Sequence, residues 1–137
     1  MAAWDNAMSP TLTRNQQLGQ RFVELASAVR KGETDGATVA ARLDDELIPA
    51  ADQLRAEAAS LRVSDAEVAR AHAQLVKAWA DRTNAWRAAA AAWKQGDLAA
   101  FDAADRQGLQ AHVGEEEAIA ALGTLARARG VEFDPYP

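Results

Sequence analysis

The 137-residue chain contains no cysteine, and its apolar residues form no long run. The absence of cysteine excludes disulfides, cysteine-ligated zinc, cysteine-ligated iron–sulfur clusters and covalent c-type haem attachment. The longest alanine run covers residues 88–92, whereas a membrane-spanning helix needs roughly 20 apolar residues. Polar residues follow Met1 almost at once, in place of the basic and apolar stretches of a signal peptide. We therefore expect neither a transmembrane segment nor a signal peptide in this chain.

The chain also lacks an excess of positive charge. It has 15 lysine and arginine residues against 20 aspartate and glutamate residues, which gives a net charge of -5. Binding to nucleic-acid phosphates depends on clustered basic side chains, and here the basic residues are scattered among acids. We expect no nucleic-acid partner.

Catalytic groups are equally scarce. The sequence has no cysteine nucleophile and no glycine-rich phosphate loop. Its two histidines, His72 and His112, lie far apart, and no hydroxyl group is placed beside either one. We expect a protein that is not an enzyme and that carries no cofactor.

A regular aromatic pattern is the most informative feature that the chain does have. Trp79, Trp86 and Trp93 recur at intervals of seven residues, and His72 stands one interval earlier. A seven-residue period returns to nearly the same face of an α-helix after two turns. Aromatic residues at helical spacing usually belong to a core, so we interpret this aromatic stripe as the buried spine of a long helix. A pocket in which the indoles line a bound molecule is the alternative.

Amphipathic patterns predict four helices joined by turns of a few residues. The predicted helices cover residues 3–31, 37–62, 65–95 and 98–129 of a single domain, and residues 131–137 are expected to form a short extended tail. Short connections favour antiparallel neighbours. The predicted fold is therefore an all-α, antiparallel up-down-up-down four-helix bundle, and its alanine content of about a quarter predicts closely packed helices.

Two prolines fall inside helical patterns. Pro10 has two interpretations: either Ser9 caps a helix that begins with the proline, or the helix begins near Ala3 and is kinked. Pro49 removes a backbone donor and crowds the preceding turn. We expect it to bend the second helix.

Two helix boundaries carry local signals. Ser64 and Glu67 have the spacing of a capping box and predict the start of the third helix. Gly96 is suited to end that helix, and Asp97 is suited to cap the next one.

Glycines interrupt the predicted fourth helix. Counting from the tight turn at residues 95–97 places Gly108 near Trp86 and Gly114 near Trp79. We expect these glycines to make room for the indoles, so that a larger residue would overpack the core by about 1–3 kcal/mol.

The same counting predicts a polar layer at the middle of the bundle, beside Trp79. Arg82 falls opposite Asp44, and Asp44 falls opposite Glu24. The residues of the predicted layer are Glu24, Asp44, Asp45, Glu46, Arg82, Thr83, His112 and Glu116. The simplest interpretation is an interhelical salt bridge from Arg82 to Asp44 or Glu46, together with a hydrogen-bonded histidine.

A metal or ligand site is the other interpretation of the layer. His112 and Glu116 stand at i and i+4, a spacing that can chelate a divalent ion, with Glu24 and Glu46 as further candidates. The sequence contains no Glu-x-x-His motif, so a carboxylate-bridged di-iron centre is not expected. His72 lies too far along the bundle to join His112, and we interpret it as a core or boundary histidine.

These observations favour a non-enzymatic helical-bundle domain that binds another protein or forms a homo-oligomer. One form of this hypothesis is the soluble domain of a membrane-anchored bacterial protein, because Trp4 and Met8 keep helical spacing with no capping residue ahead of them. A location in the cytoplasm or on the extracytoplasmic face of an anchored protein stays open. The alternative function is a bundle that binds a small ligand or metal at the polar layer.

Overall fold

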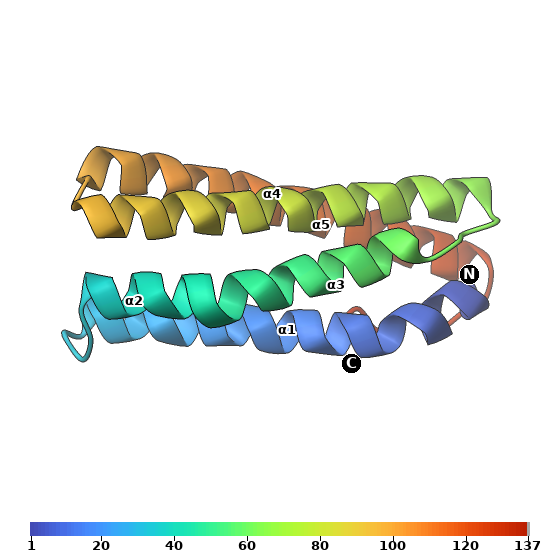
Figure 1. Cartoon of the computed structure of the whole chain (residues 1–137). Helices are drawn as coiled ribbons and strands as arrows, with labels where there is room; N and C mark the ends of the chain where they lie inside the picture. Colours follow the sequence, from blue (N-terminus) through green and yellow to red (C-terminus); the bar gives the residue numbers. More distant parts are fainter. Residues whose placement is uncertain (137) are drawn as a thin grey trace.

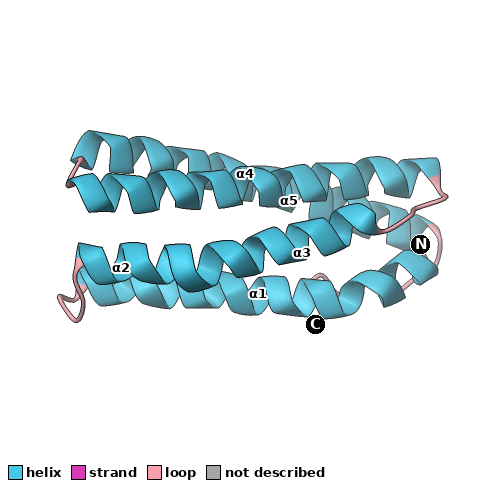
Figure 2. Ribbon diagram, viewed as in Figure 1, coloured by secondary structure: helices cyan, strands magenta, loops and turns pink. Residues whose placement is uncertain are grey.

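The structure is a computed structural model that describes residues 1–136. It contains helices α1 (Ala2–Arg30), α2 (Gly36–Arg42), η1 (Leu43–Leu47), α3 (Ile48–Ser60), α4 (Ala66–Gln95) and α5 (Leu98–Ala128). The segments α2, η1 and α3 follow one another without a break and form the second of four antiparallel rods (Figure 1). Within residues 1–136 every regular element is a helix (Figure 2). The predicted all-α four-helix bundle is confirmed.

The first helix begins at Ala2 and continues through Pro10, as in the second interpretation of that proline. Two side chains donate to carbonyl groups beside it: the Thr13 hydroxyl donates to the Ser9 carbonyl at 3.0 Å, and Arg14 Nε donates to the Pro10 carbonyl at 3.4 Å. The first turns of α1 incline toward the α4–α5 pair (Figure 1). Such a bend is expected where a proline interrupts the hydrogen-bond ladder.

Pro49 is accommodated by a widened turn. The segment η1 is a π-helix, in which the Ile48 amide bonds to the Leu43 carbonyl five residues earlier. A proline ring crowds the carbonyl four residues before it, and a π-helical turn shifts that carbonyl aside. Beyond this turn α3 leaves the direction of α2 and inclines toward α4, so the second rod is bent (Figure 1).

Aspartates cap three helices. Asp35 accepts from the Thr38 amide at 2.7 Å, and Asp97 accepts from the Ala100 amide at 3.0 Å, as predicted for Asp97. The predicted capping box at Ser64 does not form, because Asp65 accepts from the amides of Glu67 and Val68 and the helix begins one residue later. Gly96 ends α4 in the left-handed conformation, with φ of 63°.

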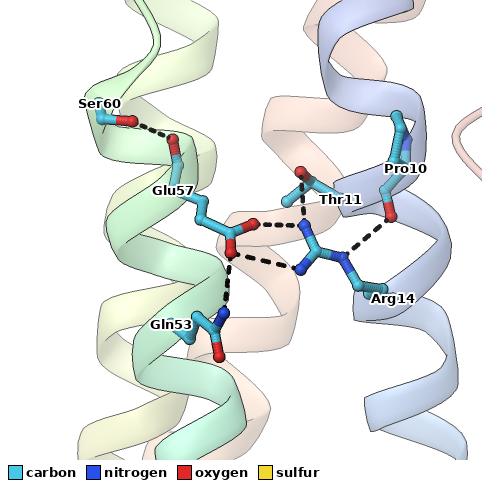
Figure 3. Close-up of polar contacts among 6 residues, drawn as sticks. All are labelled: Pro10, Thr11, Arg14, Gln53, Glu57 and Ser60. Carbon is cyan, nitrogen blue, oxygen red and sulfur yellow. Dashed lines mark hydrogen bonds and ion pairs between the residues drawn. The ribbon is translucent and has the colours of Figure 1, made fainter.

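An exposed polar cluster lies between α1 and α3, in addition to their buried contacts (Figure 3). Arg14 pairs with Glu57, and Gln53 donates to the same carboxylate at 3.1 Å. Arg14, followed by Gln53, holds the pKa of Glu57 below its ordinary value. This cluster identifies the side of α1 that faces α3.

Two groups of buried residues make up the core. The Trp79 core draws on all four rods: Trp4, Met8, Leu12, Ala58, Val68, Ala71, Leu75, Trp79, Ala118, Ile119 and Leu122. The Trp86 core lies toward the other end of the bundle: Leu18, Val39, Leu43, Leu47, Ile48, Ala51, Leu54, Trp86 and Ala90. None of the residues of the Trp86 core belongs to α5. The two halves of the bundle are therefore closed to different degrees.

Helices α4 and α5 pack along a line of small residues, here called the alanine seam. Each helix has one series of buried alanines that recurs every seven residues: Ala71, Ala78, Ala85 and Ala92 on α4, and Ala104, Ala111 and Ala118 on α5. Methyl-sized side chains allow two helix backbones to approach closely. The two helices run side by side along their length (Figure 1).

Gly108 and Gly114 belong to this seam and do not make room for the indoles. A Cβ at Gly108 would lie 3.9 Å from Ala85 Cβ, and one at Gly114 would lie 3.7 Å from Ala78 Cβ. These are ordinary contacts, so an alanine fits at either glycine. The prediction of overpacking is wrong for alanine, because the glycines face the residue that precedes each tryptophan.

The indoles of the aromatic stripe contact α1 and α2, and Trp93 also packs against Phe101 of α5, with ring centroids 4.9 Å apart. Trp79 is fully buried, Trp86 stacks on Phe22 of α1 with ring centroids 4.8 Å apart, and Trp93 is partly buried. A Cβ at Gly36 would lie 2.5 Å from Cε3 of Trp93, so this glycine allows the close approach of α2. Large side chains thus fill the space between α4 and the first two rods, and small side chains fill the narrower space between α4 and α5.

The C-terminal tail folds back over α1 and α5. Phe133 packs edge-on against Trp4 of α1, with ring centroids 5.8 Å apart, and its Cδ1 would be 3.9 Å from a Cβ at Gly123 of α5. The predicted non-helical tail along the surface is confirmed through Tyr136, and Pro137 lies outside the described residues.

Candidate functional site

A buried polar triad, made of Asn15, Arg82 and Glu115, lies at the middle of the bundle. Arg82 Nη1 donates to Asn15 Oδ1 at 2.7 Å, and Asn15 Nδ2 donates to Glu115 Oε1 at 3.1 Å. Glu115 Oε2 lies 3.8 Å from Arg82 Nη1. The Arg82 and Glu115 side chains are only 13% and 12% exposed. The triad therefore ties α1, α4 and α5 together between the two cores.

Arg82 has hydrogen-bonding capacity beyond this triad. Its guanidinium carbon lies 5.0 Å from the Trp86 ring centroid, a cation–π contact. Its Nε and Nη2 atoms and the Trp79 Nε1 atom are buried without a hydrogen-bond partner among the described residues. Burial lowers the pKa of Arg82 from its ordinary value, and the Glu115 charge opposes that shift. Arginine still stays charged at neutral pH, so the triad is a buried ion pair with spare donors.

The salt bridges predicted from Arg82 to Asp44 or Glu46 do not form. Asp44 pairs with Lys94 at the surface, and Glu46 pairs with Arg21 at 2.8 Å. The predicted levels assumed a tight turn between the second and third helices, whereas residues 61–65 form an extended connection. Asp44 therefore lies level with Lys94, about three helical turns along α4 from the predicted level of Arg82.

The remaining predicted layer residues are dispersed. Glu24 and Asp45 are exposed, and Thr83 is buried with its hydroxyl donating to the Trp79 carbonyl at 2.9 Å. His112 Nε2 lies 3.2 Å from Glu116 Oε1, but these side chains are 64% and 62% exposed. Residues 1–136 contain no group of three or more histidine, cysteine, aspartate or glutamate side chains placed to hold a metal ion.

His72 is a core histidine, as predicted. Trp4 Nε1 donates to His72 Nδ1 at 3.0 Å, and His72 Nε2 lies 2.8 Å from the Ala58 carbonyl oxygen. Because Nδ1 accepts, Nε2 carries the proton and donates to that carbonyl. Both ring nitrogens are engaged, and the residue holds α1, α3 and α4 together.

Sequence reasoning placed Arg82 in the polar layer but missed Asn15 and Glu115. Both carry a signal in the seven-residue pattern of their helices. Asn15 stands midway between Met8 and Phe22, and Glu115 stands seven residues before Leu122. A polar residue at such a core position is an exception that would have identified each partner.

The seam between α1 and α5 differs at its two ends. Its sealed half is covered by the tail, with Phe133 between Trp4 and Gly123. Its open half lies beside the Trp86 core and leaves large apolar side chains exposed. On α1 the exposed residue is Val23, at 61%, and on α5 the exposed residues are Leu98 (74%), Leu109 (61%) and, farther around the helix from Glu115, Val113 (55%).

Carboxylates accompany the tail in the sealed half. Burial and then the neighbouring Asp134 raise the pKa of Asp5 above its ordinary value. Burial, followed by the charges of Glu115 and Glu116, raises the pKa of Tyr136. The tail therefore runs past Asp5 toward the polar triad, and it docks against charge of its own sign.

Together these features define a four-helix bundle with one seam closed by alanines, a buried polar triad, and a second seam that is covered over half its length. No protein-family model, curated protein or solved structure matches this chain. Among residues 1–136, no helix combines the length and apolar character needed to span a membrane.

Proposed function

We propose that this protein is a non-enzymatic helical-bundle module that binds another protein. The observation that carries the proposal is the open half of the α1–α5 seam, where Val23, Leu98, Leu109 and Val113 are all more than half exposed. Leu98, Leu109 and Val113 recur on one side of α5 at helical spacing, and exposed apolar side chains gathered on one side of a protein are typical of protein interaction sites.

The scaffold suits this function. The alanine seam fixes α5 rigidly on α4, while the Trp86 core has no member from α5. The outer side of the first half of α5 is thus presented on a rigid support. A preorganised surface loses little conformational entropy when a partner binds.

Site-directed photocrosslinking tests the proposal. A photoreactive phenylalanine replaces Leu109 in the open half, and the matched control replaces Ala91, which is exposed on α4. Irradiation in cells of the source should give a discrete crosslinked product at position 109 and none at position 91. Light scattering on the purified chain separates self-association from binding to another protein. A strict monomer with no product at position 109 would contradict the proposal.

A second candidate function is the binding of a small anion or carboxylate at the polar triad. The observation that favours it is the set of buried donors, Arg82 Nε, Arg82 Nη2 and Trp79 Nε1, that have no acceptor among the described residues. Buried donors of this kind are usually satisfied.

Thermal unfolding with acetate, nitrate or phosphate tests this second function. A ligand of the triad should raise the Tm of the native chain and leave that of an Arg82→Met variant unchanged. Equal responses of the two proteins would contradict it.

A further inference from the structure

The tail shows how an extended segment occupies the α1–α5 seam. Residues 131–136 are not helical, and their alternate members Val131, Phe133 and Pro135 are partly buried while those between them are exposed. The Phe133 ring lies over Gly123, whose missing side chain leaves space for it. An extended segment with one aromatic side chain beside a helical glycine therefore fits this seam.

The open half contains a second glycine, Gly19, which belongs to α1. Asn15 bonds to Glu115 across the seam, and Gly19 and Val23 follow it by one and two helical turns on the same face of α1. Arg14, which pairs with α3, lies on a different face. A Cβ built at Gly19 would meet nothing within 4 Å, so the space beside it is open.

The level of Gly19 on α5 follows from the antiparallel packing. Both helices rise about 1.5 Å per residue, so residues that follow Asn15 lie level with residues that precede Glu115. Gly19 and Val23 are thus level with the α5 segment that carries the exposed Leu109 and Val113. Glycine inside a helix lowers stability by about 1 kcal/mol relative to alanine, so we expect Gly19 to serve a structural or functional purpose.

We propose, on the basis of the proposed interaction function, that the open half binds an extended, positively charged peptide segment of another protein with an aromatic side chain seated beside Gly19. The aromatic ring packs against the exposed apolar side chains of α1 and α5. The backbone of the segment continues the path that the tail takes over the sealed half.

The positive charge follows from the groups around the open half. Seven-residue steps from its exposed α5 side chains reach three carboxylates, one histidine and one arginine, namely Asp102, Asp105, Glu116, His112 and Arg106. Arg30 is the corresponding cation on the row of Val23. The local carboxylates outnumber the arginines, and the whole chain carries a net charge of -5, which attracts a cationic partner.

The tail supports the same conclusion by contrast. It carries Glu132 and Asp134 and docks beside Asp5, whose pKa is raised first by burial and then by the Asp134 charge. Its covalent link to α5 supplies a high effective concentration that offsets this repulsion. A separate peptide has no such link and therefore needs complementary charge.

Two synthetic peptides test the proposal with the full chain. The first has the tail sequence VEFDPYP, and the second, VKFKPYP, replaces both acids with lysine. Titration followed by amide NMR should show that VKFKPYP shifts the signals of Gly19, Val23 and Leu109, binds at least about tenfold more tightly than VEFDPYP, and weakens as salt is added. No shift at millimolar peptide, or shifts confined to Trp4 and Gly123 in the sealed half, would overturn the proposal.

A Gly19→Leu variant provides the structural control. Its side chain enters open space, so the variant should fold, and it should weaken VKFKPYP binding by at least about tenfold because it fills the site of the aromatic ring. Gln17→Leu adds the same side chain at an exposed position on another face of α1 and should leave binding unchanged. Equal binding to both variants would overturn the proposed site.

The two proposals fail separately. A crosslinked partner at position 109 without peptide binding would overturn the cationic peptide and leave the interaction function intact. Loss of both signals would overturn the interaction function itself.

Discussion

Helix α5 has two seams, and they are built in opposite ways. Toward α4 it presents a buried alanine every seven residues and reaches a uniform close contact. Toward α1 it has no such ladder. Contact there comes from the Trp79 core, to which Ile119 and Leu122 of α5 belong, from the polar triad and from the docked tail, whereas the Trp86 core has no buried residue of α5.

The α4–α5 seam supports the fold, and the α1–α5 seam carries the proposed recognition surface. Alanine loses no side-chain entropy on folding, so the alanine seam gains close packing at little conformational cost. The α1–α5 seam is wider and less uniform, and it leaves apolar side chains uncovered. The proposed partner would bind there without disturbing the packing of α4 against α5.

The largest expected effect comes from the polar triad, which holds the middle of the α1–α5 seam. Glu115→Ala removes the buried counter-charge of Arg82 and should lower the free energy of unfolding by about 3 kcal/mol. Urea unfolding followed by circular dichroism measures it. The double variant Arg82→Met with Glu115→Leu should recover most of the loss, and an equally unstable double variant would contradict this account.

The alanine seam should be the next most sensitive feature. Ala85→Leu adds three carbons to a residue that faces Gly108, and should cost about 1–3 kcal/mol through overpacking. Ala91→Leu, at an exposed position of the same helix, is the control and should change stability by less than about 0.5 kcal/mol in urea unfolding. Similar losses for both would mean that the seam is not closely packed.

The sealed half should respond to loss of the tail anchor. Phe133→Ala removes a partly buried ring from Trp4 and Gly123 and should cost about 1–2 kcal/mol, below the range for fully buried phenylalanine. Hydrogen exchange should then increase in the first turns of α1 and leave the alanine seam unchanged. Faster exchange across α4 and α5 would indicate that the tail supports the whole bundle.

Gly114→Ala should stabilise the protein. The added methyl group makes an ordinary 3.7 Å contact with Ala78, and alanine is the better helix former by about 1 kcal/mol. An increase of about 0.5–1 kcal/mol in the free energy of unfolding is expected from thermal or urea unfolding. A decrease would show that the two backbones are too close for a methyl group.

The smallest effect concerns pH. Because burial and Asp134 raise the pKa of Asp5, folding takes up a proton there, and acidification from neutral pH through that raised pKa should strengthen tail docking. At lower pH the loss of charge on Asp35 and Asp65, whose pKa values are depressed by amide hydrogen bonds, should act in the opposite direction. Asp134→Asn should flatten the first change by less than about 0.5 kcal/mol, as measured by the pH dependence of unfolding.

The helices and their ends could be predicted because their signals are local. Asp97 and Gly96 act where the sequence placed them, and the tight turn between α4 and α5 made the predicted levels of Gly108 and Gly114 correct. The face toward which those glycines point was not predicted, because a difference of one residue rotates a helix position by about 100°.

The polar partners of Arg82 could not be predicted by counting from turns. The π-helical turn before Pro49 and the extended residues 61–65 shift the second rod along α4, and neither length is encoded by hydrophobic periodicity. Asn15 and Glu115 were accessible by a different route, as polar exceptions at core positions. The open half depends on an absence of tertiary contact, which no local pattern reports.

On α4 each alanine of the alanine seam directly precedes a residue of the aromatic stripe or its histidine. The helix therefore repeats a dipeptide: Ala71-His72, Ala78-Trp79, Ala85-Trp86 and Ala92-Trp93. Each copy specifies a short distance to one neighbour and a long distance across the bundle. Two adjacent residues in every seven therefore specify a bundle whose cross-section is longer in one direction than in the other. It offers a pattern with which to search translated genomes for chains of the same shape.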